Sequence, residues 1–255
     1  MKQAIKAEFR KILTLRSTYI VTAIAFLLVV FFAFYIEGLR SNHEVLMDPN
    51  RLASEVTNAI IPTASLFSFV GLLLFTHEYR YSTIMYSLTS SKSRTRVLLA
   101  KIIVISCYAL LVSLLIGALS PALTYLGVQI RGLEFAPQVF PVWDLLWRTL
   151  FYGWAYSMAG LLLAALIRSQ VGSIAALFLV PSAVEGFASL ALKNNAMYLP
   201  FTALQKVIMT GQVPPEGAPF TGHLPAGKAA LVFLAYLVVG WLVAWFLFLK
   251  RDAGT

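Results

Sequence analysis

The stretch Ile102–Val128 reads IIVISCYALLVSLLIGALSPALTYLGV and carries no charged residue. A helix rises 1.5 Å per residue and the hydrocarbon layer of a bilayer is about 30 Å thick, so about 20 apolar residues are enough to cross it. The apolar character is continuous, whereas a barrel strand would alternate apolar and polar residues over about 10 positions. We therefore predict a membrane-spanning helix here.

Five further segments have the same character, so we predict an all-α integral membrane protein with six transmembrane helices. The predicted spans lie near 18–36, 57–76, 102–128, 149–167, 171–192 and 229–249. The composition agrees, because 59% of the 255 residues are hydrophobic and only 12% are charged, whereas a soluble domain carries about 25% charged residues. We expect residues 1–255 to form a single transmembrane domain.

Basic residues are unevenly distributed between the two sides that six spans define. Thirteen of the 20 basic residues, but three of the 11 acidic residues, fall on the side of the two termini. Because loops rich in Lys and Arg remain in the cytoplasm, we predict that both termini are cytoplasmic. This topology accounts for the net charge of +9 without nucleic acid as a partner.

The N-terminal segment 1–16 has a helical pattern of its own. Apolar residues recur at Ile5, Phe9, Ile12 and Leu13, and the basic residues lie off this stripe. The pattern predicts an amphipathic interfacial helix on the inner membrane surface, with its cations toward anionic lipid headgroups. An ordinary basic flank with chance periodicity is the alternative.

Between the second and third spans lies the most polar and basic segment, HEYRYSTIMYSLTSSKSRTRVLLAK, residues 77–101. Tyr81, Ile84, Met85 and Leu88 fall at i, i+3, i+4 and i+7, which predicts a short amphipathic helix on the cytosolic side. Such a helix can lie on lipid or enter a groove of a cytosolic partner. A solvated loop whose cations only enforce topology is the alternative.

The same segment resembles the cytosolic loop between spans 2 and 3 of type-2 ABC (ATP-binding cassette) exporter permeases. The matching positions are Glu78, Thr83, Leu88, Arg94 and Lys101, while Ser82 stands where Gly is usual and Ser91 where Pro is usual. The resemblance extends to the basic amphipathic N-terminal helix, the six spans and a long outer loop before the last span. It implies that this loop is a coupling helix that docks on a separate ATP-binding subunit.

The resemblance implies the membrane permease subunit of an ATP-driven exporter, which moves a hydrophobic or amphipathic substrate across the plasma membrane. ATP and Mg²⁺ would bind the partner subunit, no cofactor is expected in this chain, and the permease would pair with a second copy or a paralogue. The expected coupling residues are Glu78, Arg80, Thr83, Met85, Leu88 and Arg94. A local ion pair of Glu78 with Arg80 or Arg94 is the alternative role for that carboxylate.

Glu185 is the only charged residue within the predicted spans, four residues after Pro181, which predicts a kink in the fifth span. We take both as candidates for the transport pathway. A carboxylate that is hydrogen-bonded in the bundle, or reaches water at the boundary, remains equally compatible. Two rival functions stay open: a secondary transporter that uses Glu185, and a non-transporting scaffold or sensor.

Three further features complete the expectation. After Pro200, the residues Phe201, Leu204 and Ile208 predict a short outer helix before the last span. Small residues of the fourth span suit close helix packing, within one chain or between two; they are Gly153, Ser157, Gly160 and Ala164. The three histidines are scattered over loops on both sides, so no metal site is expected.

Overall fold

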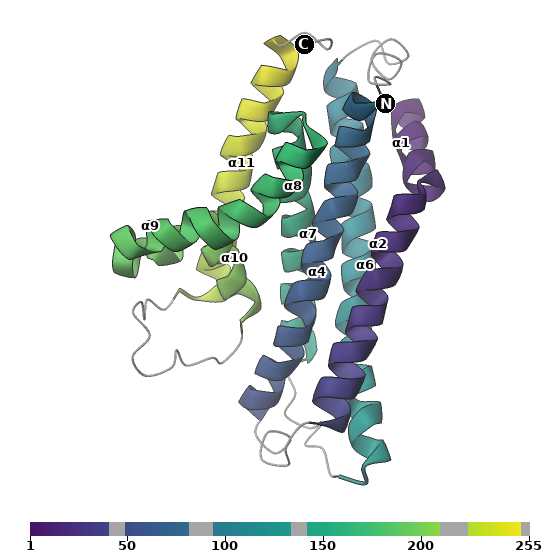
Figure 1. The fold of residues 1–255 in the computed structure, drawn as a ribbon, viewed down its shortest axis with the longest axis vertical. Helices are drawn as coiled ribbons and strands as arrows, with labels where there is room; N and C mark the ends of the chain where they lie inside the picture. Colours follow the sequence, from purple (N-terminus) through teal and green to yellow (C-terminus); the bar gives the residue numbers. More distant parts are fainter. Residues whose placement is uncertain (41–48, 82–93, 134–141, 210–223, 251–255) are drawn as a thin grey trace.

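The chain forms a bundle of long helices. In the computed structural model the described residues are 1–40, 49–81, 94–133, 142–209 and 224–250, without the side chains of 49–55, 58, 59, 64 and 94. The helices, in order, are α1 (Lys2–Thr14), α2 (Arg16–Val29), η1 (Val30–Leu39), α4 (Pro49–Arg80), α6 (Arg94–Ile130), α7 (Val142–Ile167), α8 (Gln170–Leu179), η3 (Val180–Val184), α9 (Glu185–Leu192), η4 (Lys193–Tyr198), α10 (Pro200–Ile208) and α11 (Ala226–Lys250). Figure 1 shows the start of α1 and the end of α11 at the same end of the bundle.

Among the described residues, six helical segments are long and apolar enough to cross a membrane, which confirms the predicted fold class. They are Arg16–Leu39, Ile60–Arg80, Thr95–Ile130, Val142–Ile167, Gln170–Tyr198 and Ala226–Lys250. Most are longer than the predicted spans. The longer helices therefore include the buried charged residues Glu37, Glu78 and Lys101 in addition to Glu185.

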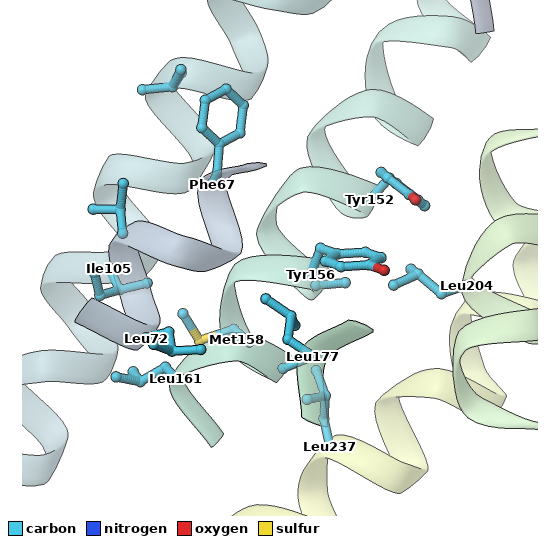
Figure 2. Close-up of a cluster of buried hydrophobic side chains, with 14 of the residues drawn as sticks. Phe67, Leu72, Ile105, Tyr152, Tyr156, Met158, Leu161, Leu177, Leu204 and Leu237 are labelled. Atoms are coloured by element: carbon cyan, nitrogen blue, oxygen red, sulfur yellow. The ribbon is translucent and has the colours of Figure 1, made fainter. Parts of the chain in front are cut away.

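The closest helix pair in the core is α4 against α7. A Cβ atom added to Gly160 would lie 2.4 Å from the Ser68 carbonyl oxygen, and one added to Gly71 would lie 2.9 Å from that of Ser157. Small residues allow such close approach, which drives helix association where lipid removes the hydrophobic difference. The packing of Ser157 and Gly160 thus lies within one chain. Figure 2 shows buried apolar side chains of the same two helices, among them Leu72 of α4 and Leu161 of α7.

A second glycine contact joins the first span to the third, far from the termini. A Cβ atom added to Gly38 would lie 2.8 Å from the Cα of Gly127, so the backbones of η1 and α6 touch. Beside this contact the Thr124 hydroxyl donates to Glu37 Oε2 at 3.1 Å. The hydrogen bond helps to satisfy a buried carboxylate, which lets the span continue past Ile36.

The fifth span is the most exposed of the six candidate spans among the described residues. Of its most apolar window 11% is buried, compared with 17% in the first span, 22% in the last and 59% in the second. Its helix changes to π-helical geometry at Val180, next to Pro181, where the ring removes a backbone donor. Figure 1 shows α8 beside the bundle and α9 projecting away from it.

The amphipathic helix α1 packs on α6 at the end of the bundle that holds the termini. Half of the predicted apolar stripe faces the core of the bundle, and half is exposed on the surface. Ile12 is buried and Ile5 packs against the core, whereas Phe9 and Leu13 are exposed. The buried face also carries Glu8, which leads to the site described next.

Candidate functional site

Charged side chains from three helices meet at the last turn of α4. Lys101 of α6 is 0% exposed and Glu78 of α4 is 5% exposed. The Lys101 ammonium donates to Glu78 Oε1 at 2.7 Å and to Glu8 Oε2 of α1 at 2.9 Å. A buried ammonium is very costly unless it is paired, so these two carboxylates account for its position.

Lys11 completes this arrangement from the next turn of α1. Its ammonium donates to Glu8 Oε1 at 2.6 Å and to Glu78 Oε1. Burial lowers the pKa of Lys11, but the carboxylates of Glu78 and Glu8 outweigh it and raise the pKa above its ordinary value. We call Glu8, Lys11, Glu78 and Lys101 the ion cluster; two acids and two bases balance its charge.

The ion cluster includes residues from the two helices that flank residues 82–93. Glu78 closes α4 and Lys101 lies in the second turn of α6, so the pair bridges the two ends of residues 82–93. Lys101 also lies 5.9 Å from the ring centre of Phe75, one turn before Glu78. The N-terminal helix therefore contacts both helices that flank the segment expected to be the coupling helix.

Two other residues of the same turn of α4, Tyr79 and Arg80, contact residues outside the ion cluster. The Arg80 guanidinium donates to Gln170 Oε1, at the start of α8, at 3.1 Å. The Arg168 guanidinium lies 5.5 Å from the ring centre of Tyr79 and 5.8 Å from that of Phe248 in α11. We call His77–Arg80 the junction turn. Residues of α1, α6 and α8 contact its side chains directly, and α11 is connected to it through Arg168.

Arg168 has a backbone conformation that fixes its position. Its φ of 58° lies in the left-handed region, and its N–H donates to the Ala164 carbonyl at 3.0 Å. This geometry ends α7 in the manner of a helix C-cap, for which Gly is the usual residue. A non-glycine residue is uncommon there, and in this chain its side chain lies between Tyr79 and Phe248.

The predicted coupling residues have different outcomes. Glu78 lies at the centre of the ion cluster, and its partners among the described side chains are Lys11 and Lys101. The alternative of a local pair with Arg94 falls on a side chain outside the description. Arg80 contacts Gln170. Thr83, Met85 and Leu88 lie outside the described residues, and Arg94 begins α6 with its side chain outside the description.

Four residues of this site were not among the predicted coupling residues: Glu8, Lys11, Lys101 and Arg168. Of these, only Lys101 was a position that carried the family resemblance. Glu8 offered a signal, because it is the only acid before Glu37 and it precedes Lys11 by three residues. That spacing places both on one helix face. Arg168 offered none, since its role depends on a tertiary contact between α4 and α11.

The pathway candidates lie at a second place, where the fifth span meets α10. Both oxygens of Glu185 accept hydrogen bonds at 2.7 Å, from the backbone N–H groups of Phe201 and Thr202, and the Thr202 hydroxyl adds a third. Of the roles left open by sequence, the hydrogen-bonded carboxylate is the one observed. A cavity of about 230 Å³ borders Glu185, and another of about 290 Å³ lies across Pro181, which lines both.

The second cavity has mixed chemistry. Hydroxyl and amide groups face it from four helices, and the rings of Phe69 and Phe178, 5.6 Å apart, form its apolar wall. Its polar lining residues are Ser65, Ser68, Tyr156, Ser182 and Gln205. Within the described ranges, no group of three His, Cys, Asp or Glu side chains gathers in a way that could hold a metal ion.

The six apolar helices among the described residues, with a polar, ion-paired junction at one end, are typical of a multi-pass membrane protein. A family model described as "ABC-2 family transporter protein" matches residues 4–184, and the chain belongs to this family. The match includes α1, the junction turn and the first turns of the fifth span. No curated protein matches the chain. Membership implies that the chain is a membrane permease that works with an ATP-binding cassette subunit.

Proposed function

We propose that this chain is the permease subunit of an ATP-driven exporter and moves a hydrophobic or amphipathic substrate across the plasma membrane. Family membership supports the permease role; the direction and substrate class are the proposed part. In this proposal residues 1–255 are a single transmembrane permease domain, and ATP and Mg²⁺ bind only the partner subunit. The excess of basic residues on the side of the termini supports a cytoplasmic position for both.

The observation that carries the proposal is the junction turn. Residues 82–93 are expected to dock on the ATP-binding subunit through Thr83, Met85 and Leu88. A displacement of that segment acts directly on Glu78 and Arg80, the last residues of α4. From there the ion cluster connects it to α1 and α6, and Gln170 connects it to the fifth span. In this proposal these contacts are enough to connect the docking segment to α1, α6 and the fifth span.

The cavity beside Pro181 supports an amphipathic substrate. Its hydroxyl and amide groups can hydrogen-bond a polar group, while Phe69 and Phe178 contact an apolar one. Its walls come from α4 and the fifth span, and α4 ends in the junction turn, so a movement of α4 changes this cavity. The largely exposed apolar surface of the fifth span supports pairing with a second copy of the chain, in a homodimer.

The test is affinity purification of the tagged chain in mild detergent, with mass spectrometry of bound proteins and measurement of ATPase activity. We expect an ATP-binding cassette subunit in stoichiometric amount. The Arg80→Ala variant should retain the subunit but respond less to substrate, because Gln170 loses its partner. The Lys250→Ala variant, at the end of α11, is the control and should behave as the unchanged protein. Absence of any ATPase, even after crosslinking, would refute the proposal.

A further inference from the structure

α10 is too short to be stable alone. It has nine residues, and isolated helices shorter than about 12 residues are marginal in water. Its first N–H groups and last carbonyls also lack partners within the helix. The preceding residue, Leu199, has no side-chain oxygen to supply a cap, so α10 depends on other parts of the chain.

The N-terminal end of α10 is bound by Glu185 of α9. This carboxylate is 4% exposed and accepts from Phe201 N, Thr202 N and Thr202 Oγ1, each at 2.7 Å. A negative charge at a helix N-terminus also meets the positive end of the helix dipole. Glu185 thus performs the capping function that Leu199 cannot, from a position 16 residues before Phe201.

The C-terminal end of α10 is bound by Arg148 of α7. Its Nη1 donates to the Val207 carbonyl at 3.1 Å, one residue before the helix ends. The guanidinium is oriented by Asp144, whose Oδ2 lies 2.8 Å from Nε, and by the Trp147 ring 5.4 Å away. A positive charge at this end again complements the helix dipole.

Between these ends, α10 forms a wall of both cavities at Pro181. Thr202 and Lys206 face the cavity beside Glu185, and Gln205 faces the polar cavity. The opposite face buries Phe201, Ala203, Leu204, Val207 and Ile208. We propose that Glu185 and Arg148 are positioning residues that hold the two ends of α10 against the fifth and fourth spans, and thereby fix the wall that α10 forms in both cavities.

A role of the two cavities in transport rests on the proposed function, but the positioning roles of Glu185 and Arg148 can be tested without transport. The chain has one cysteine, Cys107. In a Cys107→Ser background, Ala203→Cys places a thiol at a position that is fully buried on α10. The full chain in proteoliposomes is then treated with a membrane-impermeant maleimide, and the rate of labelling is measured.

We expect Glu185→Ala and Arg148→Ala each to raise the labelling rate at least tenfold. Glu185→Gln keeps one acceptor oxygen and should restore most of the protection, which general loss of structure would not predict. Thr202→Val removes only the hydroxyl donor and should raise the rate about threefold. Ser189→Ala is the matched control, because its hydroxyl donates to the Gly186 carbonyl within the same exposed helix turn and contacts neither end of α10 among the described residues. It should leave the rate unchanged.

Equal labelling in all variants, with unchanged thermal unfolding, would overturn the inference. So would equal acceleration by Glu185→Ala and Glu185→Gln, because the acceptor oxygen would then have no part. Failure of the proposed function would appear separately, as the absence of an ATP-binding subunit on purification, since the labelling experiment does not contain that subunit.

Discussion

Removal of the buried ammonium at the centre of the ion cluster should destabilise the protein strongly. Lys101→Met leaves two buried carboxylates with only Lys11 as a cation, and breaking a buried ion pair on one side costs about 3–5 kcal/mol. The two lost hydrogen bonds, at 2.7 and 2.9 Å, are both charge-assisted. For a chain of this size we expect the melting temperature to fall by roughly 6–20 °C. Tryptophan fluorescence during heating in detergent measures this.

A second substitution separates the charge imbalance from the loss of a long side chain. Lys101→Met with Glu8→Gln leaves Glu78 and Lys11 as a balanced pair, so it should be more stable than the sum of the single changes by about 1–3 kcal/mol. Lys193→Met, at an exposed lysine, is the control and should change stability little. A melting temperature of Lys101→Met equal to that control, or strict additivity in the double variant, would refute the role of the cluster.

Three further outcomes follow from other contacts. Gly160→Leu should lower stability by about 1–3 kcal/mol or prevent folding, because the Ser68 carbonyl occupies the space of even a Cβ atom; Gly186→Leu, with open space around it, is the control for the same melting assay. Lys11→Met should destabilise the protein at neutral pH. This effect should be lost only as pH rises above about 10.5, because the raised pKa of Lys11 keeps its ammonium charged below that value. A stability difference that disappears near pH 7 would contradict this. Arg168→Ala should weaken coupling of ATP hydrolysis to substrate, because α4 loses its connection to α11 through Tyr79 and Phe248; unchanged substrate stimulation in reconstituted vesicles would contradict it.

The fold was predictable because lipid imposes one simple condition on sequence. A continuous apolar run such as Ile102–Val128 can satisfy its backbone only as a helix, so the number and type of elements follow from hydropathy. The limits of the helices did not follow, because charged residues were taken as span ends. Glu37 and Lys101 continue their helices, since tertiary partners satisfy their charges.

The candidate site was predictable in part, for a related reason. Glu78 stood out as an acid at the end of an apolar span, but its partners could not be identified, since Lys11 precedes it by 67 residues. Glu185 stood out in the same way. Its carboxylate is bound by backbone N–H groups, which carry no signature in the sequence, so sequence alone could not identify its hydrogen-bond partners.

The two fixed ends of α6 have a mechanical consequence. Near the termini Lys101 fastens it to α1 and α4, and about 39 Å along the helix Gly127 lies against Gly38 of the first span. A helix held near both ends should move together with the helices that hold it, so we expect the first three spans to move as one unit. The fifth span, whose most apolar window is only 11% buried, has more freedom to move relative to them.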